Sequence, residues 1–193
     1  MKYYQDITLL PDAEANLGFL WHKVYQQLHI ALVENKATDN GSAIAISLPT
    51  YGDKAFPLGN KLRLFANSSE QLNALDINAW ISRLADYTHC TSIKEVPESV
   101  SEVACFKRKQ FSTNLTRLAR RRVKRHGGTV EEALDHFASF EDEHTKLPFI
   151  NIKSLSKDQQ FRLFIECDKS AQPIQGEFNC YGLSKTNATV PWF

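Results

Sequence analysis

The chain has 193 residues, of which 42% are hydrophobic and 23% are charged, and its formal net charge at pH 7 is +1. These values are ordinary for a globular protein with a sizeable core, built as one large domain or two small ones. No apolar run is long enough to span a bilayer, and the first residues, MKYYQDITLL, lack the apolar core of a signal peptide. We therefore expect no membrane partner, and four cysteines without CxxC pairing, which read as reduced thiols, indicate a cytoplasmic protein.

The first half of the chain predicts the element order β-α-β-β-α-β. This order is that of the split βαβ, or ferredoxin-like, unit, and Pro97-Glu98-Ser99 is a plausible junction after it. The predicted strands cover residues 3–10, 42–48, 62–66 and 91–96, and the predicted helices cover residues 17–35 and 69–87. The sequence thus predicts a ferredoxin-like domain over residues 1–97.

The second half, residues 98–193, predicts a separate domain, so that the whole chain belongs to the α+β class. Thr129 and Glu132 fit a capping box at the start of its second helix. In its first strand, alternation puts Phe106, Arg108 and Gln110 on one side. The predicted strands cover residues 103–111, 149–154 and 160–166, and the predicted helices cover residues 113–126 and 129–140.

Positive charge is concentrated in one stretch of this second half. Residues 105–130 contain nine basic side chains and no acidic one, whereas the remainder has 14 basic and 22 acidic residues, a net charge of −8. Such a block in a nearly neutral protein is typical of a surface that binds a polyanion.

Helical periodicity divides the basic stretch into two faces. Leu115, Leu118, Ala119 and Val123 form an apolar seam that also takes in Arg122, which then needs a partner or a path to solvent. Residues 112–114 provide capping side chains, and Gly127-Gly128 provides the stop. The opposite arc carries Arg117, Arg120, Arg121 and Lys124, with Arg125 at its edge. The helix is predicted to protrude from its domain as a binding ridge.

Three interpretations of this helix differ in their expected composition. A solvated surface helix usually mixes both signs of charge, and this one does not. A helix that binds a membrane surface or calmodulin needs bulky apolar residues, whereas half of this seam is Ala119 and Val123. Nucleic acid is therefore the favoured ligand.

The kind of nucleic acid follows from groove geometry. The paired aromatics of RNP-type strands are absent from the sequence. A helix enters the deep major groove of A-form RNA only where the groove is opened, so a short RNA hairpin fits better than a long duplex. Arg108 and Gln110 could read base edges with bidentate hydrogen bonds, and their alternative is a role as surface polar residues of a strand.

The sequence offers few groups for catalysis. It has no P-loop, GxGxxG, HExxH or paired acidic cluster for two Mg²⁺ ions, and its four cysteines have neither CxxC pairing nor histidines at zinc-finger spacing. We predict no metal and no cofactor. RNA cleavage would then use the ribose 2′-hydroxyl as nucleophile and a histidine as general base. Position alone does not choose among the six histidines; His126 fits a phosphate contact or a helix cap.

Four segments resemble the type I-F CRISPR repeat-processing endoribonuclease family. They are QQLHIALV around His29, the arginine-rich RRRVKRH, LPFINIKSLSKDQQFRLFIE, and the terminal CYGLSK with VPWF. The resemblance spans nearly the whole chain in the family's order. It implies cleavage of CRISPR precursor RNA at the base of each repeat hairpin without a metal, leaving a 2′,3′-cyclic phosphate. The enzyme would then stay bound to the mature crRNA as a subunit of the type I-F surveillance complex.

The resemblance also implies roles for single residues. His29 matches the catalytic histidine, Ser154 matches the serine that holds the attacking ribose, and Tyr181 matches a supporting tyrosine near the active site.

For RNA binding, Arg108 and Gln110 match a pair that reads bases near the foot of the stem. Phe161 matches an aromatic that stacks on a base beside the cut. The groove-binding helix would contribute Arg117, Arg120, Arg121, Lys124, Arg125 and His126.

Two positions of the helix, Ala119 and Lys124, depart from the denser arginine run expected of the family. Lysine lacks the bidentate fork of arginine, so single phosphate contacts differ while the binding mode is kept. A rival hypothesis is a subunit that binds the crRNA hairpin without cutting it.

Overall fold

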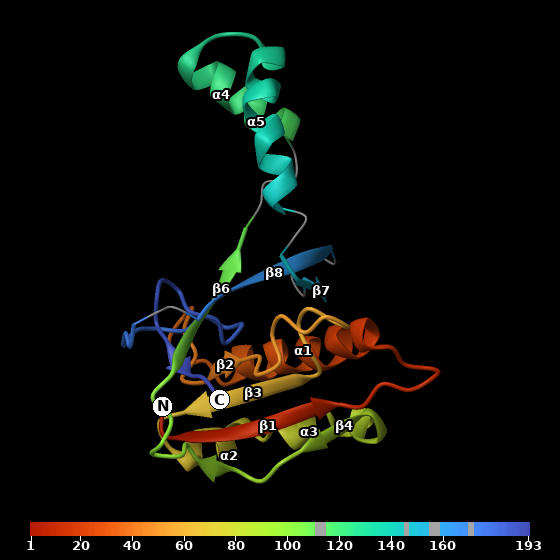
Figure 1. The fold of residues 1–193 in the computed structure, drawn as a ribbon, viewed down its shortest axis with the longest axis vertical. Coiled ribbons are helices and arrows are strands. Elements are labelled where there is room, and N and C mark those ends of the chain that lie inside the picture. The colour runs from red at the N-terminus through yellow and green to blue at the C-terminus, as the bar shows by residue number, and fades with distance from the viewer. Residues whose placement is uncertain (111–114, 145–146, 155–158, 170–171) are drawn as a thin grey trace.

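The computed structural model describes residues 1–110, 115–144, 147–154, 159–169 and 172–193 (Figure 1). It shows a mixed α+β fold with two antiparallel sheets, which confirms the predicted class. Figure 1 shows the long helix α1, Leu17–Glu34, between the two sheets. None of the described helices is long and apolar enough to cross a membrane.

The first sheet has the strand order β2-β3-β1-β4, and β5 also pairs with β1. All of its pairings are antiparallel, and Asp6 of β1 lies opposite Arg63 of β3. Its strands are β1 (Tyr3–Leu9), β2 (Ala45–Ser47), β3 (Lys61–Ala66), β4 (Thr88–Cys90) and β5 (Lys94–Glu95).

The single helix predicted over residues 69–87 was wrong. The segment forms three pieces: α2 (Ser69–Leu75), α3 (Ile77–Trp80) and the 3₁₀ helix η1 (Ser82–Tyr87). The first break lies at Asp76, whose φ of 41° is left-handed, a conformation that Asp tolerates better than most residues. The strand predicted at 91–96 is confirmed only at β5, Lys94–Glu95, and the other pairing with β1 lies before it, at β4.

The second sheet has the strand order β7-β8-β6-β9. Its strands are β6 (Val103–Lys109), β7 (Phe149–Lys153), β8 (Gln160–Asp168) and β9 (Val190–Pro191). Residues 111 and 155–158, at the predicted end of the first strand and in the predicted hairpin tip, lie outside the described residues.

One hydrophobic core joins the two sheets through α1. Asn16 caps α1 by accepting a hydrogen bond from the Phe19 backbone N–H at 3.0 Å, and the helix then buries an apolar stripe. Both sheets contribute fully buried residues to the core, such as Ile7 and Leu64 from the first and Leu163 and Ile165 from the second. The division into domains at residue 97 stays a prediction.

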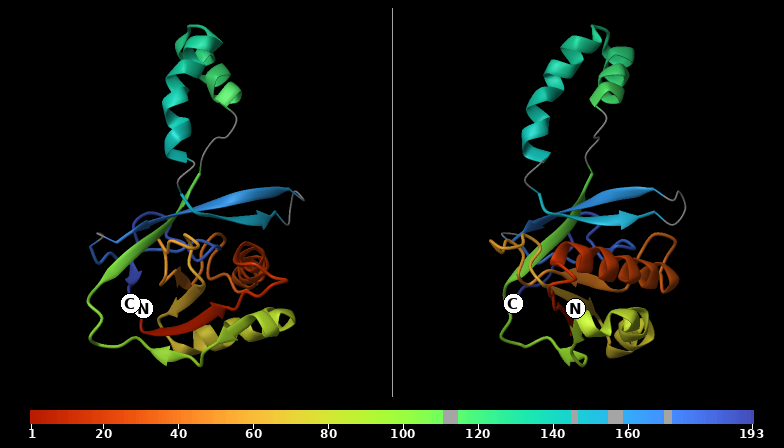
Figure 2. Two further views of the ribbon diagram at one scale, coloured as in Figure 1. Left: turned by 45° about the vertical axis from the view of Figure 1, so that its right-hand side comes forward. Right: turned by 90° about the vertical axis from the view of Figure 1, so that its right-hand side faces the viewer.

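The helices α4 (Leu115–His126) and α5 (Val130–His144) pack on each other and project from the sheets (Figures 1 and 2). We refer to this pair as the α4–α5 hairpin. The predicted capping box is confirmed: the Thr129 N–H donates to Glu132 and the Glu132 N–H donates to the Thr129 hydroxyl. The predicted stop at Gly127 is confirmed by its φ of 73°, and the caps predicted at 112–114 lie outside the described residues.

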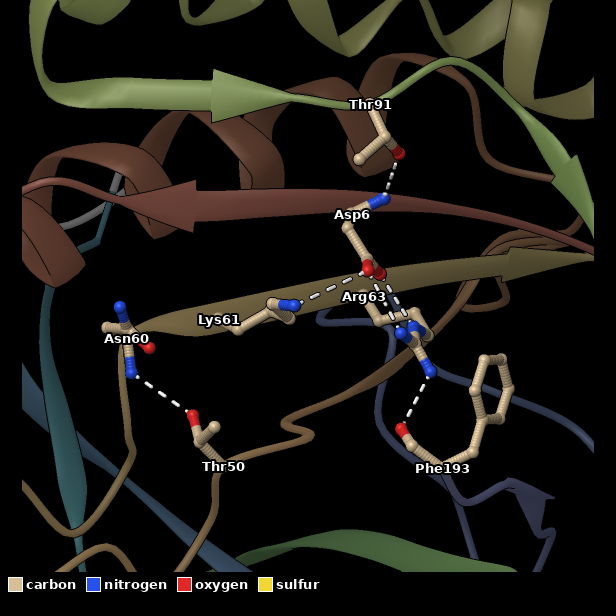
Figure 3. Close-up of polar contacts among 7 residues, drawn as sticks. All are labelled: Asp6, Thr50, Asn60, Lys61, Arg63, Thr91 and Phe193. Atoms are coloured by element: carbon tan, nitrogen blue, oxygen red, sulfur yellow. Dashed lines mark hydrogen bonds and ion pairs between the residues drawn. The ribbon is translucent and has the colours of Figure 1, made fainter.

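A buried ion pair ties the end of the described chain to the first sheet (Figure 3). Arg63 makes two hydrogen bonds to the Asp6 carboxylate, at 2.6 and 2.9 Å, and donates to the backbone oxygen of Phe193 at 2.8 Å. The Phe193 ring stacks 3.8 Å from the Arg63 guanidinium carbon. Lys61 lies 3.8 Å from Asp6 at the edge of this network.

Candidate active site and nucleic-acid interface

Four side chains from four separate elements form one stack beside α1. The rings of His29 and Tyr181 lie face to face, with centroids 4.2 Å apart and planes 6° from parallel. The guanidinium carbon of Arg108 lies 5.2 Å from the Tyr181 ring and 5.3 Å from the Phe161 ring. The structure therefore brings together α1, β6, β8 and the loop around residue 181.

The half-buried ring of His29 has its two nitrogens in different environments. Nδ1 lies 2.9 Å from the backbone oxygen of Cys180. Because a carbonyl oxygen only accepts, Nδ1 carries the proton of the neutral ring and Nε2 keeps its lone pair. Burial lowers the pKa of His29; the hydrogen bond to Cys180 opposes this effect, and the nearby charge of Arg108 adds to it. These effects favour the neutral imidazole, and among the described residues Nε2 makes no hydrogen bond, as a general base needs.

The loop that carries Tyr181 is fixed by its backbone. The Asn179 side chain accepts a hydrogen bond from the Tyr181 N–H at 2.8 Å, and the buried Tyr25 hydroxyl donates to the Tyr181 carbonyl at 2.8 Å. Gly182 has a φ of +72°, and an added Cβ would lie 2.5 Å from the Ile46 side chain. Only glycine fits this turn, so the ring of Tyr181 has a defined position against His29.

Ser154 lies directly after β7, the edge strand that packs along α1. Its own N–H donates to the Gln159 carbonyl at 2.8 Å. The preceding N–H, of Lys153, donates to Oε1 of Gln26 on α1 at 2.8 Å. Two consecutive backbone N–H groups therefore hold the chain at Ser154, one bonded to α1 and the other to the residue that precedes β8.

Arg108 and Gln110 have different environments. Arg108 pairs with Ile165 in the sheet and is half-buried in the stack. Gln110 follows the end of β6 and is exposed. The structure thus places Arg108, but not Gln110, among the stacked side chains.

The cationic residues of α4 lie away from the stack, on the projecting α4–α5 hairpin (Figure 1). The side chain of Arg117 lies outside the described part of the structure. Arg122, placed by periodicity in the apolar seam, is exposed, so its charge reaches solvent. The remaining predicted contacts are also exposed: Arg120, Arg121, Lys124, Arg125 and His126.

Ala119 is fully buried at the seam between α4 and α5, and Ala133 of α5 is 3% exposed. An arginine at position 119 would enter this packed interface. The departure from a dense arginine run therefore has a structural cause.

Sequence reasoning missed the residues that hold the site in place. Tyr25 was visible only as a neighbour of His29 one helical turn away, and no sequence pattern marks Gln26 or Asn179. Within the described ranges, no three His, Cys, Asp or Glu side chains gather as a metal site would require. All four cysteines are free thiols, and Cys105 and Cys180 are buried.

Comparison with known proteins decides the family. The model of the family described as CRISPR-associated protein (Cas_Csy4) matches residues 4–193. The chain belongs to this family. Two relatives, both described as CRISPR-associated endonuclease Cas6/Csy4, match over the full length of both chains: one from Escherichia coli (strain UTI89 / UPEC) is 38% identical, and one from Pseudomonas aeruginosa (strain UCBPP-PA14) is 34% identical.

Membership of the Cas_Csy4 family confirms the resemblance identified from the sequence motifs. A solved structure described as an RAMP protein binding different RNA substrates also aligns over the full length of both chains, with a TM-score of 0.39 and 11% identity. A similarity this low carries no argument about fold or function.

Proposed function

We propose that this chain is an endoribonuclease that cleaves CRISPR precursor RNA at the base of the repeat hairpin. The observation that carries the proposal is the hydrogen bond from His29 Nδ1 to Cys180, which leaves Nε2 free as a base. The names of the two full-length relatives support the same activity. We propose that the reaction takes place in the cytoplasm.

In the proposed reaction, Nε2 of His29 removes the proton of a ribose 2′-hydroxyl. The 2′-oxygen attacks the adjacent phosphorus, the bond to the 5′-oxygen breaks, and the departing oxygen takes up a proton. The products are a 2′,3′-cyclic phosphate and a 5′-hydroxyl, and no step needs a metal ion or another cofactor. Ser154 would hold the attacking ribose, and Tyr181 would support the His29 ring by stacking.

The proposed RNA contacts extend from the site to the α4–α5 hairpin. Phe161 would stack on a base beside the cut, and Arg108 and Gln110 would read bases near the foot of the stem. The opened major groove of the stem would receive the basic face of α4, with Arg117, Arg120, Arg121, Lys124, Arg125 and His126. Such an interface favours retention of the cleaved hairpin, so that the protein remains bound to crRNA as a subunit of the type I-F surveillance complex.

We also infer that the first half is a ferredoxin-like unit over residues 1–97, followed by an RNA-binding domain over residues 98–193 that bears the arginine-rich helix. The order β2-β3-β1-β4 of antiparallel strands, with helices after β1 and β3, supports this assignment.

Three measurements on a repeat hairpin test the proposed function. A 2′-deoxyribose at the cut should prevent cleavage while binding persists, and cleavage of that substrate would contradict internal attack. His29→Ala should abolish cleavage and retain binding, and EDTA should leave the wild-type rate unchanged. Tight binding by the wild-type protein without any cleavage would instead support a non-catalytic crRNA-binding subunit.

A further inference from the structure

We propose that Gln26 is a positioning residue for the cleavage reaction. By binding the backbone beside Ser154, it would align Ser154 with His29 along α1. This inference rests on the proposed function. Its structural basis is a side-chain contact between α1 and the edge strand β7.

Side chains of α1 bind backbone groups on the open side of the edge strand β7. β7 ends its sheet, so alternate N–H and C=O groups have no partner strand on one side. Two side chains of α1 bind these groups: Nδ1 of His22 lies 2.7 Å from the Asn151 oxygen, and Oε1 of Gln26 accepts from the Lys153 N–H at 2.8 Å.

The two contacts are separated by nearly the same distance along the helix as along the strand. From His22 to Gln26 is one turn of helix, an axial rise of about 6 Å. From Asn151 to Lys153 is a rise of about 6.6 Å along the strand. β7 therefore runs beside α1 in the same direction, and Ser154 follows on the same path toward the next turn, which carries the catalytic candidate.

Gln26 leaves one of its own groups unsatisfied. Its Nε2 is buried and has no hydrogen-bond partner among the described residues. The assignment of the two amide atoms is fixed, because the Lys153 N–H is a donor and must face Oε1. A buried, unpaired donor destabilises the fold, and this cost offsets part of the stability gained from the hydrogen bond to Lys153. What the glutamine supplies is the anchor beside Ser154.

The test is a double-mutant cycle between Gln26 and Ser154. Gln26→Met keeps the length of the side chain and removes both polar atoms of its amide. Single-turnover cleavage of a repeat hairpin should fall about 10-fold, because misplacing a reacting group by a fraction of an ångström has an effect of this size. In a Ser154→Ala background the same change should lower the rate less than 2-fold, since the group it positions is gone.

Two further measurements separate positioning from folding and from binding. The melting temperature of Gln26→Met should stay within a few degrees of the wild type, because the change removes an unpaired donor together with one hydrogen bond. Affinity for a hairpin with a 2′-deoxyribose at the cut should change less than 2-fold. Gln27→Met, one residue further along α1 and turned away from β7, is the matched control and should cleave at the wild-type rate.

Each contrary result overturns the inference in a recognisable way. A wild-type rate for Gln26→Met shows that the anchor does not matter. A 10-fold loss in both backgrounds shows that Gln26 does not act through Ser154, and weaker binding of the 2′-deoxy hairpin shows that the amide contacts RNA directly. Should Gln26→Met fold poorly, Gln26→Asn, which is one methylene too short to reach Lys153, repeats the cycle. Failure of the proposed function itself is distinct, because the wild-type protein would then not cleave.

Discussion

At the scale of single residues, the site is a set of stacked planar side chains, three rings and one guanidinium, in which each contacts its neighbour. Arg108 lies over the rings of both Phe161 and Tyr181, and Tyr181 stacks on His29. The guanidinium thereby places a positive charge near the imidazole without bonding to it. Its effect is electrostatic, and a titration can measure it.

Removing the charge of Arg108 should raise the pKa of His29. Burial and the positive charge both disfavour the imidazolium, so the wild-type midpoint should lie below the ordinary value of about 6.5. In Arg108→Gln the midpoint should move toward higher pH, as followed by nuclear magnetic resonance of the His29 ring in the free protein. Arg162→Gln removes a charge that lies over Phe149 on the other face of β8, and it should leave the midpoint in place.

The stacking of Tyr181 predicts that its ring, and not its hydroxyl, supports catalysis. Tyr181→Phe keeps the ring against His29 and should cleave within about 3-fold of the wild-type rate. Tyr181→Leu removes the flat surface and should slow single-turnover cleavage about 10-fold, because the imidazole loses its orientation. Equal rates for the leucine and phenylalanine variants would contradict a role for stacking.

The sequence supplied the identities of these residues but not their proximity. His29, Phe161 and Tyr181 became candidates through a family resemblance and Arg108 also through strand alternation, but no periodicity links positions so far apart in the chain. The anchors Gln26 and Asn179 were missed because their partners, Lys153 and the Tyr181 backbone, are defined only by the folded chain.

At the scale of elements, the α4–α5 hairpin presents its cations because a small residue lets its two helices approach. Ala119 is fully buried where α4 packs on α5, whereas Arg120 and Arg121 are exposed. Local sequence predicted these helices well, through the capping box at Thr129 and the stop at Gly127. It failed for residues 69–87, where the left-handed backbone of Asp76 interrupts a regular apolar pattern.

Ala119→Arg should weaken binding of the RNA repeat hairpin although it adds a positive charge. The larger side chain cannot fit between α4 and α5, and overpacking of this kind costs about 1–3 kcal/mol. Thr116→Arg adds the same charge at an exposed position of α4 and should bind the hairpin at least as tightly as the wild type. Electrophoretic titrations of both variants decide the point, and tighter binding by Ala119→Arg would show that charge outweighs packing.

The salt dependence of binding should report the number of phosphates that α4 contacts. If about five are neutralised, the logarithm of the affinity should fall with a slope of about 0.7–0.9 per phosphate against the logarithm of salt concentration. Replacing Arg120 and Arg121 by Gln should reduce this slope by the contribution of nearly two phosphate contacts. Arg83→Gln, an exposed arginine on η1, should leave the slope unchanged; a flat response of the wild type would exclude the proposed interface.

At the scale of the whole molecule, the buried Asp6–Arg63 pair joins the first sheet to the last described residues of the chain. Those residues follow β9, which pairs with β6, the strand that carries Arg108. The network therefore links the sheet of the first half to the strand that supports the candidate site.

Arg63→Met should lower the free energy of unfolding by about 3 kcal/mol. The change leaves the Asp6 carboxylate buried without its principal partner, which is strongly destabilising. Lys61→Met removes a half-exposed cation 3.8 Å from the same carboxylate and should cost less than about 1 kcal/mol. Chemical denaturation of the two variants compares them, and similar losses would show that the bidentate bond adds little.

The strands that lead into and out of the α4–α5 hairpin, β6 and β7, lie on either side of one residue of β8. Phe164 of β8 pairs with Lys109, the last residue of β6, and also with Phe149, the first residue of β7. With adjacent strands about 4.8 Å apart, the two exits are about 10 Å from each other, a gap that a few glycines can bridge. The α4–α5 hairpin can therefore be exchanged for that of a relative without changing the strand register, and such an exchange tests whether α4 sets RNA specificity as proposed.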